Sequence, residues 1–229
     1  MTDIRPVVLS LFSNYRFGPA FWELDSAVRG KAARSFLESI ESVADGTSFY
    51  SMSGTHSGVD LMVWSTVRVE SPASPAEFFV RRGAAEARFR SWLDPLGVLW
   101  GLTRPSEYSR ARSAQEIDPF EKERMTYLIA YPFTKTSDWY LLGREARQGM
   151  MNEHITIGKQ FREIKQLLLY SFGLQDHEFV VVYETEDLDQ FSRLVHDLRA
   201  TEGRRYTKAD APLQIGVRTD VEGIVGSLD

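Results

Sequence analysis

The chain of 229 residues contains no cysteine. This absence excludes disulfide bonds, thiolate metal sites and cysteine nucleophiles, and it is consistent with a cytoplasmic location. The sequence has no run of about 18 apolar residues, so it predicts no membrane-spanning helix. Positive charge is also in short supply, because the net charge is −5 at pH 7. Nucleic acid is therefore not an expected partner, since binding to its backbone requires a basic surface.

Apolar and aromatic residues are plentiful, at 43% and 12% of the chain, which is enough for a packed interior. The first half of the sequence predicts elements in the order βαββαβ, and the second half repeats that order. In the first half we expect strands at 7–12, 48–53, 59–66 and 97–103, and helices at 27–44 and from about 75 to 93. In the second half we expect strands at 125–131, 166–172, 178–184 and 213–217, and helices at 141–159 and 188–200.

The two halves also share a local sequence pattern. Residues 48–78 and 167–191 both run from an apolar strand through a glycine turn into a second apolar strand, an acidic turn and a helix ending in phenylalanine. This repetition predicts an α+β fold made of duplicated ferredoxin-like units, with residues 1–112 forming one half and 113–229 the other. Two sheets that each have one uncovered apolar face would pack together as a dimeric α/β barrel within one chain.

The helix expected at 141–159 carries one of the four histidines of the chain. A four-residue spacing places it on one stripe with three apolar side chains, and the stripe consists of Leu142, Ala146, Met150 and His154. Arg147 and Lys159 flank this stripe, and Lys135 lies in the turn before it. An apolar slot edged by cations suits a flat apolar ligand that carries carboxylates, such as a porphyrin.

His154 therefore has two interpretations from the residues alone. A buried imidazole must be hydrogen-bonded or coordinated, because an unpaired buried polar group costs about 1–3 kcal/mol. An ordinary hydrogen-bonded core histidine is the more common outcome, and an axial ligand of a porphyrin iron is the alternative. A conventional zinc site is not expected, since the other histidines show no metal-ligand spacing.

The segment around His154 resembles the signature of the chlorite dismutase family, and in particular its coproheme decarboxylase branch. The resemblance covers residues 125–206, includes the second strand pair SFGLQDHEFVVVYET, and is weak in the first half. The matching positions are Tyr131-Pro132-Phe133, Lys135, Trp139-Tyr140, Met151, Glu153-His154 and Ile157-Gly158.

This resemblance implies a haem b or coproheme site in which His154 is the axial iron ligand. Glu202 matches a family carboxylate that accepts the other ring N–H and makes the imidazole a stronger donor. Without a metal, Glu202 would be a solvated residue near a helix end. Trp139 and Met150 would pack against the porphyrin, and either could equally be an ordinary core residue.

The resemblance also implies roles for three residues around the propionates of the substrate. Tyr131 matches a tyrosine that relays a radical, since a phenol can lose a proton and an electron together. Otherwise Tyr131 is a core residue at a strand end. Lys135 and Arg147 would bind propionates, although Arg147 could also be a solvated helix residue.

On the distal side of the iron, chlorite dismutases carry an arginine. Counting back from the Gly173 turn places this position at Gln166, and counting forward from His154 places it at Leu167. Neither residue is an arginine. A glutamine there is similar to many decarboxylases, so the resemblance implies weak chlorite chemistry at most.

The function implied is peroxide-dependent oxidative decarboxylation of coproheme to haem b, with hydrogen peroxide as the co-substrate. One alternative is a haem-dependent chlorite dismutase or peroxidase. Another is a non-catalytic α/β-barrel protein, with or without haem, that acts by binding. The family resemblance also implies a homo-oligomer, specifically a homopentamer.

Overall fold

The computed structural model describes residues 6–108 and 113–228 of the chain. It divides into two compact units, one made of Met1–Thr103 with Ile215–Asp229 and one made of Arg104–Gln214. The predicted boundary at residue 112 lies outside the described residues. The last 15 residues belong to the first unit, whereas the prediction placed all of 113–229 in the second half.

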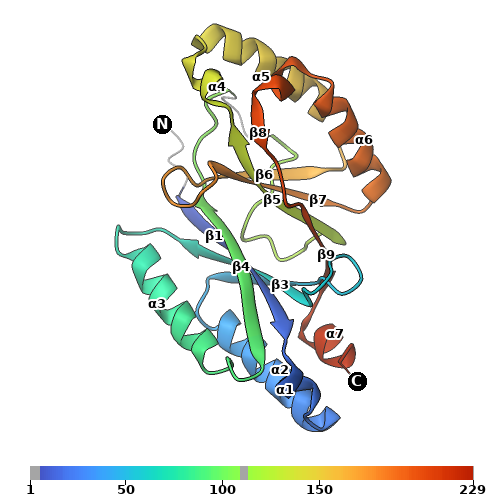
Figure 1. Cartoon of the computed structure of the whole chain (residues 1–229). Helices are drawn as coiled ribbons and strands as arrows, with labels where there is room; N and C mark the ends of the chain where they lie inside the picture. The colour runs from blue at the N-terminus through green and yellow to red at the C-terminus, as the bar shows by residue number, and fades with distance from the viewer. Residues whose placement is uncertain (1–5, 109–112, 229) are drawn as a thin grey trace. The chain divides into compact units, whose positions relative to one another are not determined.

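The first unit is a ferredoxin-like α+β unit. Its antiparallel strands lie in the order β4-β1-β3-β2. The strands are β1 (Val8–Phe17), β2 (Gly46–Ser51), β3 (Leu61–Arg68) and β4 (Leu93–Leu102). The helices are α1 (Pro19–Trp22), α2 (Ser26–Glu41) and α3 (Ser74–Ala87), and α2 and α3 pack against each other (Figure 1). The observed order β1-α2-β2-β3-α3-β4 matches the predicted βαββαβ.

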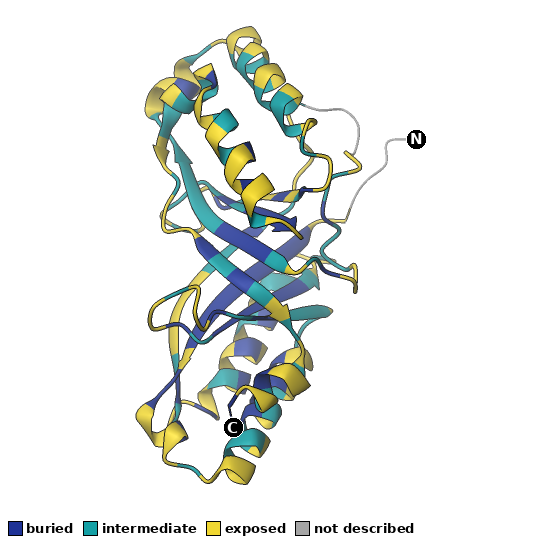
Figure 2. Cartoon of the chain, turned by 90° about the vertical axis from the view of Figure 1, so that its right-hand side faces the viewer, coloured by how far each residue is buried: buried dark blue, intermediate teal, exposed yellow. Residues whose placement is uncertain are grey.

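A closed apolar core fills the space between the helices and the sheet of this unit. Helix α2 contributes Ala33, Phe36, Leu37 and Ile40, all of them fully buried. They pack against the strand residues Phe17 and Val63 among others. Buried positions are concentrated in the strands and on the sides of helices that face them (Figure 2). Helix α2 therefore follows the ordinary rule that an amphipathic helix buries its apolar stripe.

The second unit repeats the ferredoxin-like arrangement. Its antiparallel strands lie in the order β6-β7-β5-β8. The strands are β5 (Tyr127–Lys135), β6 (Lys165–Tyr170), β7 (Phe179–Thr185) and β8 (Thr207–Ala209). The helices are α4 (Ser137–Leu141), α5 (Arg144–Gly158), α6 (Leu188–Arg199) and the 3-10 helix η1 (Glu202–Tyr206). Helices α5 and α6 lie side by side (Figure 1).

Two predicted elements of the second half are wrong in detail. The helix expected at 141–159 is broken, because Leu142 has an extended backbone and α5 starts after Gly143. Leu142 is therefore not on the helix of His154. The break places Glu145 in the first turn of α5, where a negative charge is favourable.

The closing strand of the second unit is also not the predicted one. The short strand β8 closes it, whereas the segment expected at 213–217 belongs to β9 (Gln214–Thr219), which pairs with β2 and leads into α7 (Val221–Gly226). Gly216 permits this pairing, because a Cβ there would lie 2.6 Å from the Cβ of Tyr50. A strand of three residues gives no periodicity from which the sequence could have predicted it.

The α+β fold of duplicated ferredoxin-like units is thus confirmed. Among the helices of the described residues, none is long and apolar enough to cross a membrane.

Candidate functional site

The helix-facing side of the second sheet brings several of the predicted site residues together. Tyr183 on β7 marks this side, because its ring packs on Phe191 of α6 with centroids 5.3 Å apart. In the strand register, Tyr183 is directly opposite Gln166 on β6 and Ile129 on β5. Because side chains alternate along a strand, the same face also carries Tyr131, Phe133, Lys135, Leu168 and Tyr170.

Helix α5 and the sheet face opposite it bury few of each other's side chains. Helix α5 lies wholly within the described residues, and none of its residues is buried. On the facing strand, Leu168 is 42% exposed and Gln166 is exposed. The equivalent layer of the first unit is closed by the buried residues of α2. The helix-facing side of the second unit is therefore more accessible than that of the first, as binding of a flat apolar ligand would require. We call this accessible surface, formed by α5, Gln166 and Leu168, the open layer.

The imidazole of His154, on α5, has the protonation state that metal coordination requires. Partial burial of the imidazole and, as the smaller cause, the positive charge of Lys135 together lower its pKa to about 4. The ring is therefore neutral at pH 7, and a neutral imidazole nitrogen is a metal ligand. Among the described residues, none forms a hydrogen bond with this imidazole. A ring that is neutral and unbonded is available for coordination.

This low pKa predicts how the ligand-free protein responds to acid. The unfolded imidazole has a pKa near 6.5, so protons favour the unfolded state, and stability is lost as the pH falls from about 6.5 towards 4. Between pH 7 and pH 5 the wild type should lose about 2 kcal/mol more free energy of unfolding than the His154→Gln variant. Urea unfolding of both proteins at the two pH values measures this difference. His196→Gln, at a surface position, is the control, and equal pH dependence in wild type and His154→Gln would contradict the expectation.

Lys135 contacts the elements that neighbour the helix of His154. Its Nζ donates to the carbonyl oxygen of Gly203 at 3.2 Å and lies 4.3 Å from the ring centroid of Trp139. Burial and the charge of Arg204, opposed by Glu178, together lower the pKa of Lys135 to about 8. Lys135 is thus a partly buried cation beside His154.

Trp139 is a buried residue of α4, with 4% of its surface exposed. Its ring packs between Tyr206 and Tyr108, with centroids 5.8 Å and 6.4 Å away. The indole therefore forms part of the wall beside Lys135 and His154.

Glu202 lies near the helix of His154, but its carboxylate does not reach the imidazole. The backbone N–H of Glu202 donates to the Glu153 carboxylate at 3.2 Å, which joins η1 to α5. The Glu202 carboxylate is 63% exposed and pairs with Arg205 at 3.3 Å. Its support of His154 stays a prediction.

Tyr131 is held as a neutral phenol. Burial raises its pKa well above the usual value, and the neighbouring Tyr183 hydroxyl and Asp210 raise it further, whereas Arg199 opposes them. The rings of Tyr131 and Tyr183 are stacked with centroids 6.5 Å apart. A neutral phenol with a polar neighbour retains the proton that a radical relay would have to release. That role stays a prediction.

Arg147 lines a hollow of about 350 Å³ together with Glu107, Tyr108 and Arg144. The Arg147 Nε is buried and has no hydrogen-bond partner among the described residues. An unsatisfied guanidinium nitrogen is a donor that a ligand carboxylate could use. Met150 lies one turn before His154 and is half-buried, so it also borders the open layer.

The strand register separates the two candidates for the distal position. Gln166 lies on the helix-facing side with Tyr131 and Lys135, and its side chain is exposed. Leu167 points to the opposite side of the sheet and is 6% exposed. Only Gln166 shares the face that looks towards the open layer.

Known proteins now identify the family. The chlorite dismutase family model matches residues 29–219. The chain belongs to the chlorite dismutase family. Coproheme decarboxylase from Mycolicibacterium smegmatis (strain ATCC 700084 / mc(2)155) is 29% identical over 222 residues, covering 95% of this chain and 93% of that protein. Coproheme decarboxylase from Staphylococcus carnosus (strain TM300) is 26% identical over 187 residues, covering 73% and 72%.

Solved structures show the same fold. A putative chlorite dismutase superposes with a TM-score of 0.79 at 24% identity, covering 97% of this chain and 99% of the other. Chlorite dismutase from Candidatus Nitrospira defluvii in complex with imidazole gives a TM-score of 0.81 at 22% identity, covering 96% and 94%. The predicted family and fold are confirmed, and this chlorite dismutase family member is related to enzymes over nearly its whole length.

The residues of the site fit an iron porphyrin. In the described part of the chain, no three His, Cys, Asp or Glu side chains form a metal site. An iron atom at His154 would therefore take its other ligands from a porphyrin, which would lie against the accessible side of α5. The buried, unpartnered Nε of Arg147 fits a carboxylate of such a ligand.

Two residues near the site were not predicted from the sequence. Tyr183 was seen only as part of an apolar strand, although its alternation with Glu184 could have indicated that the two side chains lie on opposite faces. Gln115 lies in the segment taken as a polar linker, and it binds both β6 and the end of α5. No local pattern marks a glutamine in a loop as a contact to a distant strand.

Proposed function

We propose that this chlorite dismutase family protein is a coproheme decarboxylase, which converts coproheme to haem b by peroxide-dependent oxidative decarboxylation of two propionates. The observation that carries the proposal is the open layer beside His154, because α5 buries none of its residues whereas α2 of the first unit closes its layer. A helix with an unfilled apolar side and a neutral, unbonded imidazole is suited to a flat iron-containing ligand.

Four side chains would hold the porphyrin. His154 would ligate the iron through a ring nitrogen, and Met150 would contact the apolar ring. Lys135 and Arg147 would bind propionates, because both are partly buried cations that border the layer. When bound, the porphyrin supplies the redox-active iron at which a peroxide is activated.

The protein's own part in the reaction is to place the substrate and to move a proton. Tyr131 would release a proton and an electron together from its phenol, next to the propionate that reacts. Burial, together with the Tyr183 hydroxyl, raises the pKa of Tyr131 and would keep it protonated until then. Gln166 would face the peroxide with a neutral amide that can donate a hydrogen bond.

The choice of reaction rests on two further supports. The curated relatives from Mycolicibacterium smegmatis and Staphylococcus carnosus are named coproheme decarboxylases. We assign the distal position to Gln166, so the arginine expected of chlorite dismutases would be missing from this chain at that position. We also propose a homo-oligomer, in the form of a homopentamer, located in the cytoplasm.

A coproheme titration tests the proposal. Wild-type protein should develop an intense Soret band on saturation, and His154→Ala should lose the axial-ligand spectrum and bind at least about tenfold more weakly. Peroxide added to the wild-type complex should then yield haem b, detected by mass. His196→Ala is the matched control, because the His196 side chain is 86% exposed. No coproheme binding by the wild type would overturn the proposal, and oxygen release from chlorite would favour a dismutase.

A further inference from the structure

The amide of Gln115 holds the end of the helix that carries His154. Its Nε2 donates to the carbonyl oxygens of Phe161 at 2.8 Å, Ile164 at 3.0 Å and Gly158 at 3.3 Å. Gly158 is the last residue of α5, and the other two lie in the loop that leads into β6. The last carbonyls of a helix have no partner within the helix, so a donor from elsewhere in the chain satisfies them.

The backbone of the same segment holds Gln166. The N–H of Gln166 donates to the carbonyl oxygen of Gln115 at 2.7 Å, and the N–H of Ile117 donates to the carbonyl oxygen of Gln166 at 2.9 Å. Glu116 thereby forms a parallel bridge with Gln166. Ile117 is 1% exposed, so a buried side chain anchors the segment. Gln166 cannot slide along the strand without breaking both backbone bonds.

One residue therefore connects the two sides of the open layer. His154 lies one helical turn before Gly158, whose carbonyl the Gln115 side chain binds, while the Gln115 backbone binds Gln166. We propose that Gln115 is a positioning residue that fixes the amide of Gln166 relative to the helix of His154. This proposal rests on the proposed function for its catalytic meaning. The contacts of Gln115 with the end of α5 and with Gln166 do not depend on a ligand, so they can be tested in the ligand-free protein.

The first test uses the ligand-free protein. Gln115→Met keeps the length of the side chain and removes the amide donor. Amide hydrogen exchange over residues 158–166 should become about tenfold faster in this variant, because one hydrogen bond is worth about that factor. Gln160→Met is the matched control, since Gln160 is exposed in the same loop. Unchanged exchange in Gln115→Met would overturn the proposal whether or not coproheme binds.

The second test asks whether Gln115 acts through Gln166. Cyanide is the probe, bound to the coproheme complexes of wild type, Gln115→Met, Gln166→Leu and the double variant. Gln115→Met should weaken cyanide binding about tenfold, and it should have no further effect when Gln166 is already Leu. Equal and additive effects in both backgrounds would show that Gln115 does not act through Gln166. Faster exchange with unchanged cyanide affinity would show a structural role only.

These outcomes are separate from failure of the proposed function. If the wild type binds no coproheme, the proposed function fails while the exchange measurement still decides the contact of Gln115 with the loop. If the wild type binds coproheme and Gln115→Met behaves as wild type in both measurements, the positioning role is wrong and the proposed function stands.

Discussion

The Tyr131→Phe variant is expected to bind coproheme as the wild type does and to release haem b at least about 100-fold more slowly. A phenylalanine keeps the ring that stacks near Tyr183 but has no hydroxyl to lose, and removal of a positioned proton donor typically costs a factor of 10² to 10⁴. The measurement is haem b formation by mass during peroxide titration, after the Soret band has confirmed equal loading.

Tyr127→Phe is the control for this expectation. Tyr127 lies on the same face of β5, four residues before Tyr131. Its replacement removes a hydroxyl from the same strand and leaves Tyr131 unchanged. Normal decarboxylation by Tyr131→Phe would show that the radical passes elsewhere, and the role of Tyr131 would then be rejected. Loss of coproheme binding instead would show a binding role.

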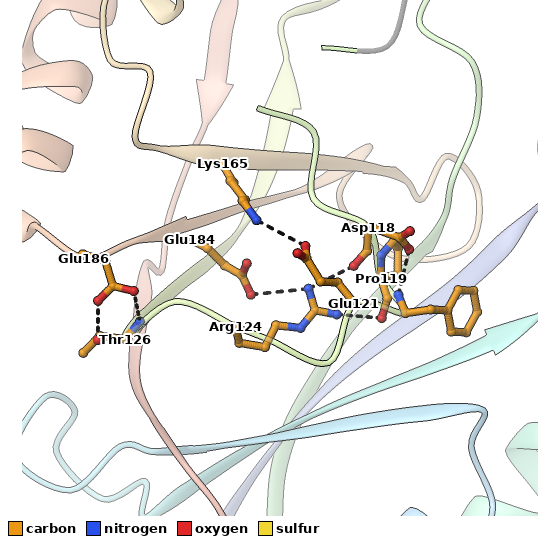
Figure 3. Close-up of polar contacts among 9 residues, drawn as sticks. Asp118, Pro119, Glu121, Arg124, Thr126, Lys165, Glu184 and Glu186 are labelled. Carbon is orange, nitrogen blue, oxygen red and sulfur yellow. Dashed lines mark hydrogen bonds and ion pairs between the residues drawn. The ribbon is translucent and has the colours of Figure 1, made fainter. Parts of the chain in front are cut away.

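Replacement of Arg124 by alanine should destabilise the second unit by about 3–5 kcal/mol. Arg124 and Glu184 form an ion pair at 3.6 Å with side chains 2% and 0% exposed. Arg124 also donates to the carbonyl oxygens of Pro119 at 2.7 Å and Asp118 at 3.0 Å (Figure 3). Its removal takes away the buried ion pair with Glu184 and both hydrogen bonds to the loop that precedes β5. Urea unfolding measures the change.

Lys165→Ala provides the comparison within the same region. Lys165 pairs with Glu121 at 3.2 Å, but both side chains are partly exposed, at 29% and 40% (Figure 3). Solvent screens such a pair, so its loss should cost less than about 1 kcal/mol. The double variant Arg124→Met with Glu184→Leu should recover most of the stability lost in Arg124→Ala. A loss below about 1 kcal/mol in Arg124→Ala would mean that water reaches Glu184 once the arginine is gone.

Most helices and strands could be predicted because their signals are local. A run of β-branched and aromatic residues predicted β7. The amphipathic spacing after Asp187 predicted α6, whose first turn the Asp187 carboxylate caps. The break at Leu142 was missed because the apolar stripe continues across it, whereas backbone conformation at a single residue ends the helix.

Pairing between distant strands could not be predicted in the same way. The segment Gln214–Thr219 has an ordinary strand pattern, but nothing in it specifies whether β2 or a neighbouring strand of its own half will be its partner. The structure selects β2, where Gly216 allows a close approach to Tyr50. Which strands pair depends on the surfaces that the rest of the chain presents as it folds. The sequence of a single segment does not encode those surfaces.

The sequence by itself determined the family, the duplicated α+β fold and the candidates His154, Tyr131, Lys135 and Gln166, since these depend on residue type and short-range spacing. Only the tertiary structure decided that Gln166 and not Leu167 faces the helices, that α5 leaves its layer open, and that Gln115 joins β6 to α5. The physical reason is that register, burial and loop contacts arise between segments far apart in the chain. Because the chain has no cysteine, thiolate ligands are excluded. The fold instead provides the neutral imidazole of His154 on the open layer as a metal ligand.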